Sequence, residues 1–169
     1  MMNHAYAFAD WLGAPRGDNL LLRLLGRFLI PSLGFVRARI DEINDARISV
    51  RIPLRRRTKN HLGSMYFAVL AAGADTAAGF LALHHIRKVD PEVVLIFKDF
   101  KAEFLRRVDG DALFICEAGE AIAAAVAEAA DSGERVNVKA PLVCLIRGQE
   151  SRGPAAVFEF TVSLKKKRS

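Results

Sequence analysis

The sequence has few of the residues that would build a disulfide framework, a metal centre or an aromatic surface for nucleic acid. It contains two cysteines, one tryptophan and two tyrosines in 169 residues. Cys116 and Cys144 both lie within apolar runs, which favours two small buried side chains over a disulfide scaffold. Neither a Cys-x-x-Cys pair nor a His-Glu-x-x-His helix is present, so the sequence predicts no metal site.

The usual motifs of nucleotide and hydrolase chemistry are also missing. The chain has no Gly-x-Gly-x-x-Gly segment, no P-loop and no Gly-x-Ser-x-Gly elbow, so we expect no resident cofactor and no α/β-hydrolase triad.

An uncharged apolar stretch of about 18 residues is lacking, which argues against a membrane-spanning helix. Residues 1–12 have no basic region followed by an apolar one and include Asp10, so a cleaved secretory signal is not expected and the sequence predicts a cytoplasmic protein.

What the chain does contain is an ordinary globular balance with an excess of positive charge. Hydrophobic residues make up 51%, charged residues 26%, and the formal net charge is +6. Basic clusters at residues 55–59 and 165–168 suit an anionic partner, although the first can equally be a solvated loop and a terminal cluster is most often a solvated end. Nucleic acid is not expected, because the first cluster has no interleaved aromatic residues and no nucleic-acid-binding motif is visible. Phosphate-bearing molecules remain, with contact to a membrane surface as the less favoured alternative.

Residues 1–34 are predicted to form a helical extension that precedes a main domain over residues 35–169. Asp18 is the expected N-cap of a helix that Pro31 ends. Between them the segment is apolar except for Arg23 and Arg27, which are four residues apart and share one face. Two interpretations stay open: a helix that simply packs on the domain, and a lid over an apolar pocket or an interfacial membrane helix.

The main domain is predicted to have an α+β fold with an antiparallel sheet. Period-2 alternation predicts strands over residues 36–41 and 47–54, joined by a turn at Asn44–Asp45. Four further strands are expected over residues 93–104, 112–117, 135–146 and 155–164, with a helix over 119–131. The segment from Gly63 to about His84 is too long and too uniformly apolar for a strand, so it predicts a buried central helix that packs across the sheet.

A single carboxylate, Asp75, interrupts this central helix. It lies in a stripe of small residues that includes Ala68, Ala72 and Gly79. Carboxylates are rarely buried without a partner or a task. Asp75 could therefore act as a general base or nucleophile on a group bound along the stripe, or it could bond to the backbone or to Thr76 at a subunit interface.

The start of the central helix is the second candidate site. Ser64 is predicted to be the N-cap, and the unpaired backbone N–H groups that follow it could hold a thioester carbonyl as it becomes an oxyanion. Asn60 and His61 could orient that group, although His61 can equally be a turn or capping residue.

These residues resemble a motif of the hotdog-fold thioesterase superfamily, in its PaaI-like branch and a related domain of unknown function. The family pattern is Asn-x-x-Gly-x-x-His-Gly-Gly, followed further along the helix by Ala-Asp-Thr. Here the segment begins Asn-His-x-Gly-Ser-Met-Tyr, and the match in register is at Asn60, Gly63, Asp75 and Thr76. Residues 66–68, Tyr-Phe-Ala, replace His-Gly-Gly. The similarity covers residues 35–164.

The resemblance implies a hotdog fold, in which a long helix is wrapped by an antiparallel sheet and protomers pair as a homodimer, or further as a tetramer. It implies hydrolysis of an acyl-CoA or acyl-carrier thioester, with coenzyme A present only as part of the substrate. The alternative is a non-catalytic module that binds acyl-CoA or lipid. The implied catalytic set is Asp75, Asn60, the backbone N–H of Phe67, and Thr76. The expected substrate-binding set is His61, Gly63, Ser64, Tyr66 and Ala68, with Arg57 and Lys59 added because their charges suit the phosphates of coenzyme A.

Overall fold

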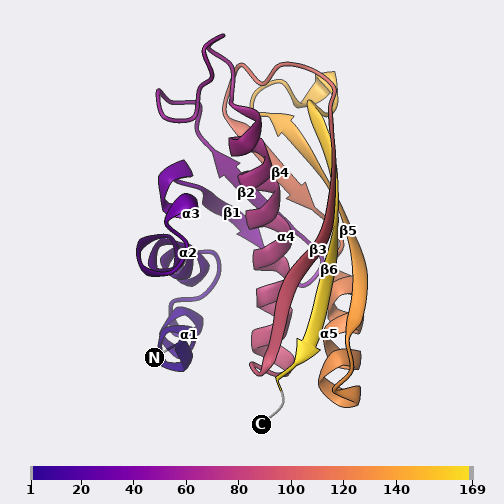
Figure 1. The fold of residues 1–169 in the computed structure, drawn as a ribbon. Helices are drawn as coiled ribbons and strands as arrows, with labels where there is room; N and C mark the ends of the chain where they lie inside the picture. The colour runs from indigo at the N-terminus through magenta and orange to yellow at the C-terminus, as the bar shows by residue number, and fades with distance from the viewer. Residues whose placement is uncertain (1, 168–169) are drawn as a thin grey trace.

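A helix of 23 residues, α4 (Phe67–Val89), forms the centre of the computed structural model, which describes residues 2–167. A six-stranded antiparallel sheet curves around α4 (Figure 1). The strands lie in the order β1-β2-β4-β5-β6-β3, so β1 and β3 are the edges. Their bounds are β1 (Arg39–Ile43), β2 (Ile48–Ile52), β3 (Val93–Phe104), β4 (Ala112–Cys116), β5 (Val136–Ile146) and β6 (Ala156–Lys166). The predicted α+β hotdog fold is confirmed.

The remaining helices lie beside this central unit. α1 (Met2–Leu12), α2 (Arg16–Phe28) and α3 (Pro31–Val36) stack along one side of α4, on the opposite side from β3 (Figure 1). α5 (Gly119–Ser132) lies beside the C-terminal end of α4 and packs against α4 and β5, and η1 (Glu150–Arg152) is a short 3-10 turn. By length and composition alone α4 could cross a bilayer, yet most of its apolar window is buried inside the fold. It is therefore the core helix around which the sheet packs.

Glycine at position 73 lets α4 lie close to the sheet. A Cβ atom added there would overlap the ring of Phe114 on β4, which is itself fully buried. A Cβ added at Gly79, two turns further along, would meet Phe97 at an ordinary contact distance of 3.6 Å. The two glycines of α4 therefore have different structural roles: the first permits a close approach, and the second does not need to be glycine for packing.

We predict opposite effects for the same substitution at these two glycines. Gly73→Ala should lower the free energy of unfolding by about 1–3 kcal/mol, because the methyl group overpacks the ring of Phe114. Gly79→Ala should leave stability unchanged or raise it by up to about 1 kcal/mol through helix propensity. Urea denaturation of the two variants measures both. Equal losses would show that the close contact at Phe114 does not limit the packing of α4.

Four sequence-based boundaries were wrong. α4 ends at Val89, five residues beyond the expected end near His84. α4 begins at Phe67 with Tyr66 as its N-cap, not at Ser64, because residues 59–66 first form a closed loop. The N-cap of α2 is Pro15, and Asp18 lies inside that helix. The first strand begins at Arg39 rather than near Val36, which ends α3. In the last three cases a tertiary contact or a turn displaced a local capping or periodicity signal.

Candidate functional site

The chain enters α4 through a loop that its own polar groups hold closed. The backbone N–H of Asn60 donates to Ser64 O at 2.8 Å, and its side-chain Oδ1 accepts the N–H of Leu62 at 2.9 Å. Asn60 Nδ2 also donates to Ser64 Oγ at 3.1 Å. Gly63 has φ +79°, a left-handed conformation that glycine adopts without strain. This loop is therefore shaped by Asn60, Gly63 and Ser64. The polar atoms of the Asn60 side chain form hydrogen bonds within the loop itself.

Two unpaired backbone donors are found where this loop meets α4. The N–H of Tyr66 donates to Thr58 O at 2.9 Å, and those of Val69 and Leu70 both donate to Tyr66 O. Within residues 2–167, the N–H groups of Phe67 and Ala68 have no such acceptor. They form the positive end of the helix and can donate to a developing oxyanion.

Phe67, which carries one of these donors, lines a hollow of about 500 Å³. The hollow is apolar for most of its lining, and its exposed members include the rings of Phe67 and Phe104. These two rings meet edge to face with centroids 6.5 Å apart. The other lining residues are Asn60, His61, Ser64, Met65, Tyr66, Leu70, Arg106, Arg107 and Val108.

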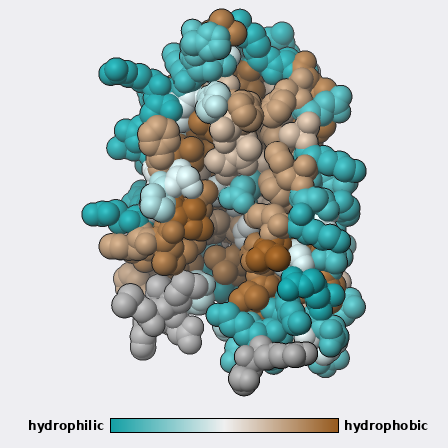
Figure 2. Space-filling view, in the orientation of Figure 1, coloured by the Kyte–Doolittle hydropathy of each residue, from teal (hydrophilic) through white to brown (hydrophobic). Residues whose placement is uncertain are grey.

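Asp75 lies further along α4 on its partly exposed stripe. Its carboxylate has neither a hydrogen bond nor an ion pair to any residue that the structure describes, and burial raises its pKa above the ordinary aspartate value. The neighbours on that stripe are small, and beside it Phe97 of β3 approaches Gly79. In Figure 2 the surface over α4 is largely apolar, with a small hydrophilic spot near its middle. A half-buried carboxylate without a partner in apolar surroundings is suited to proton transfer.

The helix geometry separates the two candidate groups within one chain. Asp75 follows Phe67 by eight positions, which corresponds to about 12 Å along a helix axis. A carbonyl held by the α4 donors is therefore out of reach of the Asp75 carboxylate of the same chain. If both groups act on one substrate, the second must come from another copy of the protein.

The other predicted site residues are divided between the hollow and the surrounding fold. Thr76 is buried, and its hydroxyl donates to Ala72 O at 2.7 Å inside α4. Arg57 does not line the hollow at the α4 start; it lies against Phe35 and donates to Phe35 O at 3.4 Å. Lys59 pairs with Met65 through the backbone bridge that closes the loop. The structure therefore brings His61, Ser64 and Tyr66 to the hollow. Besides Asp75, the predicted site residues that do not line it are Arg57, Lys59, Gly63, Ala68 and Thr76.

Sequence reasoning missed three residues that line this hollow from the far end of β3. Phe104 ends the strand, and Arg106 and Arg107 follow it after one intervening residue. Arg107 Nη2 donates to Leu62 O at 2.7 Å and so ties this segment to the loop before α4. The period-2 alternation of apolar residues along β3 could have singled out Phe104, but only the sheet pairing shows which end of the strand meets α4.

The two histidines at the other end of α4 have a structural role. His84 Nε2 lies 2.8 Å from Asp45 Oδ1, and His85 Nε2 lies 3.1 Å from Asp45 O. Hydrogen bonds from Lys88 and His84 hold the pKa of Asp45 at about 2. The cluster fastens the β1–β2 turn to α4, far from the hollow at the start of the helix.

A family model for "Domain of unknown function (DUF4442)" matches residues 17–144. No curated protein matches the chain by sequence. Among solved structures, the protein of unknown function PA5026 from Pseudomonas aeruginosa, named a probable thioesterase, is 23% identical, with a TM-score of 0.71 over 87% of this chain and 95% of that one. A protein of unknown function from Chlorobaculum tepidum is 14% identical, with a TM-score of 0.77 over 90% of this chain and 97% of that one. The thioesterase HI1161 from Haemophilus influenzae is 16% identical, with a TM-score of 0.58 over 86% of this chain and 88% of that one. At these identities the likeness shows the fold alone.

Proposed function

The chain belongs to the DUF4442 family, which is defined without a function, and from this premise we propose that it is a thioester hydrolase acting on an acyl-CoA or acyl-carrier substrate. The proposal rests on one observation above the others. Asp75 is a half-buried carboxylate without a partner among the described residues, on the central helix of a fold shared with thioesterases. Because such a group destabilises the folded state, its presence favours a catalytic role over a packing role.

The helix start and the carboxylate divide the chemistry between them. The N–H groups of Phe67 and Ala68 donate to the thioester oxygen as it becomes an oxyanion. Asp75 accepts a proton from a water molecule, whose oxygen forms a bond to the carbonyl carbon. Collapse of the tetrahedral intermediate breaks the carbon–sulfur bond and releases a carboxylic acid and a thiol, with the proton from Asp75 returned to the sulfur. This role for the loop and helix is the one implied by a PaaI-like arrangement.

We propose that the working unit is a homodimer, because one chain cannot bring both groups to one substrate. β3 is an edge strand of 12 residues that exposes apolar side chains, among them Val94, Ile96 and Phe100. An uncovered edge of this kind favours pairing with a second strand. Two copies joined there with antiparallel α4 helices would bring Asp75 of one toward the α4 start of the other. Further pairing of two such dimers would give a tetramer.

The substrate class follows from charge and from the lining of the hollow. Apolar and aromatic side chains suit an acyl group, and Arg106 and Arg107 add positive charge at the same place. The net charge of +6 favours an anionic carrier such as coenzyme A or an acyl-carrier protein. Both are intracellular molecules, in agreement with the proposed cytoplasmic location.

The direct test is release of free thiol from a panel of short, long and aromatic acyl-CoA substrates, on a preparation whose molar mass in solution is measured alongside. We expect turnover on at least one member and a mass of twice the 18.6 kDa chain or a multiple of that. A strictly monomeric protein would contradict the shared site. Absence of thiol release across the panel would contradict hydrolysis of acyl-CoA.

One observation favours a second candidate, a module that binds acyl-CoA or lipid without hydrolysing it. Phe67 takes the place of a glycine of the hotdog motif, and its exposed ring stands at the edge of the hollow where a thioester would approach. Phe67→Gly separates the two candidates. Hydrolysis that appears only in this variant would indicate that the natural chain binds its ligand without turnover.

A further inference from the structure

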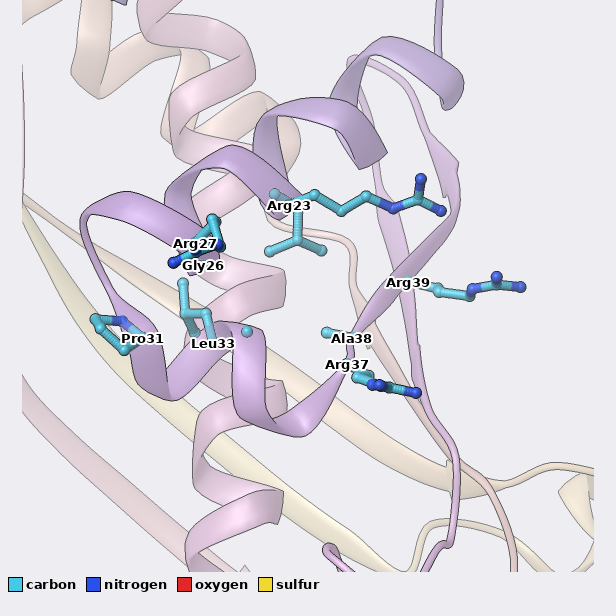
Figure 3. A pocket seen from close by; sticks show the side chains of 10 residues that line it. Arg23, Gly26, Arg27, Pro31, Leu33, Arg37, Ala38 and Arg39 are labelled. Atoms are coloured by element: carbon cyan, nitrogen blue, oxygen red, sulfur yellow. The ribbon is translucent and has the colours of Figure 1, made fainter.

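Arginine is the main charged residue lining three adjoining hollows around the N-terminal helices. The first, of about 490 Å³, lies between α2, α3 and the start of β1, and Figure 3 shows Arg23, Arg37 and Arg39 extending toward the same side. The second hollow shares Arg23 and Arg39 with the first, and the third shares Arg37 with it. The three therefore form one continuous surface. We call its unpaired cations the arginine belt: Arg16, Arg23, Arg27, Arg37, Arg39, Arg55, Arg56 and Arg57.

The charge of this belt is not balanced by ion pairs among the described residues. Asp41 is the acidic residue among its lining residues, and it is already bonded to Arg51 at 2.9 Å. Across residues 2–167, no belt arginine forms an ion pair with a carboxylate. Arg37 moreover has φ +53°, a conformation that non-glycine residues seldom adopt. So many unpaired guanidinium groups on one surface produce a strong positive potential that only an external anion can neutralise.

Exposed apolar side chains stand at the edges of the same belt. The guanidinium carbon of Arg27 lies 5.6 Å from the ring centre of Phe28, and that of Arg57 lies 5.7 Å from the ring centre of Phe35. Phe28 is 70% exposed and Trp11, which precedes a residue of the second hollow, is 77% exposed. The aliphatic side chains at positions 29 and 30, Leu and Ile, are exposed as well. The surface thus combines cationic side chains with exposed hydrophobic ones.

We propose that the arginine belt docks the protein on the surface of a bilayer that contains anionic lipids. Arginines bind the phosphate groups of such lipids, while aromatic and aliphatic side chains enter the boundary between headgroups and acyl chains. A small soluble phosphate compound fits less well, because the belt arginines are spread over three open hollows and are not gathered in one enclosed site. Single-stranded nucleic acid binds through bases that stack on aromatic rings, and this mode of binding does not account for the exposed aliphatic side chains of Leu29 and Ile30. From the sequence, contact with a membrane was a weaker expectation than binding of a phosphate-bearing molecule, because the belt residues are dispersed along the chain.

Trp11 makes the proposal directly measurable, because it is the single tryptophan of the chain, is exposed, and directly precedes Leu12, which lines the second hollow. The full-length protein is mixed with vesicles of equal parts phosphatidylcholine and phosphatidylglycerol, or of phosphatidylcholine alone. We expect sedimentation with the anionic vesicles only, a loss of binding at high salt, and a blue shift of Trp11 emission that brominated lipid quenches.

A pair of matched variants locates the binding surface. Arg27→Glu/Arg56→Glu reverses two belt charges and should weaken binding to anionic vesicles by more than about tenfold. Arg147→Glu/Arg152→Glu makes the same net charge change at exposed positions near η1 and should leave binding close to that of the natural chain. Equal weakening by both pairs, binding to neutral vesicles, or no binding at all would overturn the proposal. A Trp11 response to single-stranded oligonucleotide without one to vesicles would overturn it in favour of nucleic acid. None of these measurements depends on thioester hydrolysis.

Discussion

Asp75→Asn is expected to lower thioester turnover by about 100-fold or more and, at the same time, to raise the melting temperature at neutral pH. The first effect follows because an amide cannot accept the proton of the attacking water. The second follows because burial raises the pKa of Asp75, so the ionised side chain is a cost to the folded state that the neutral isostere removes. Thiol-release kinetics and thermal unfolding of the same preparation measure both effects.

The pH dependence of the two effects has a defined sign. Because the folded-state pKa of Asp75 exceeds its unfolded value, the folded protein binds more protons between the two values. The contribution of this group to stability therefore falls as pH rises through that window. The thermal gain of Asp75→Asn should shrink below the ordinary aspartate pKa of about 3.9. In the natural chain, kcat/KM should rise with pH through the raised pKa as the base becomes ionised.

An exposed aspartate on another helix provides the control for this substitution. Asp131→Asn makes the same chemical change on α5, where the side chain is exposed. We expect the Asp131→Asn variant to hydrolyse the thioester at the rate of the natural chain and to unfold at the same melting temperature. If Asp75→Asn kept the natural rate, Asp75 would have no place in the mechanism; if it lowered the melting temperature, its role would be structural.

Asp18→Ala is expected to lower the free energy of unfolding by about 3 kcal/mol. Arg87 Nη2 of α4 donates to Asp18 Oδ1 of α2 at 2.7 Å, and the two side chains are only 8% and 5% exposed. Removing the carboxylate leaves a buried guanidinium without this counter-charge. Urea denaturation at neutral pH gives the value.

The matched control is an ion pair at the surface of the same region. Asp41 bonds Arg51 at 2.9 Å, but its side chain is 39% exposed, so solvent screens the attraction. Asp41→Ala should cost less than about 1 kcal/mol. Equal losses for Asp18→Ala and Asp41→Ala would show that burial does not strengthen the α2–α4 pair.

Several elements could be predicted closely from local signals. The third strand was expected over residues 93–104 and lies there, because period-2 alternation and the turn at residues 109–111 are local properties of the chain. The helix over 119–131 was also confirmed to within one residue, with Gly133 at its left-handed C-cap. Asp75 stood out for a similar reason, since a charge inside a long apolar helix is visible in the sequence itself.

A closed loop and a long-range ion pair decided two features that the sequence missed. Ser64 has the chemistry of an N-cap, but Asn60 uses it to close a loop, so the helix begins at Phe67. Asp18 likewise has the chemistry of an N-cap but pairs with Arg87, which is distant in the sequence. No local pattern reveals a partner that only the packing of α2 on α4 supplies.

The sequence by itself therefore determined the α+β class, the central helix and its unusual carboxylate, because periodicity and composition act between near neighbours in the chain. Only the tertiary structure decided that β3 is an edge and that eight dispersed arginines form one belt. These two features depend on how strands pair and helices pack, and those contacts join residues that the sequence keeps far apart.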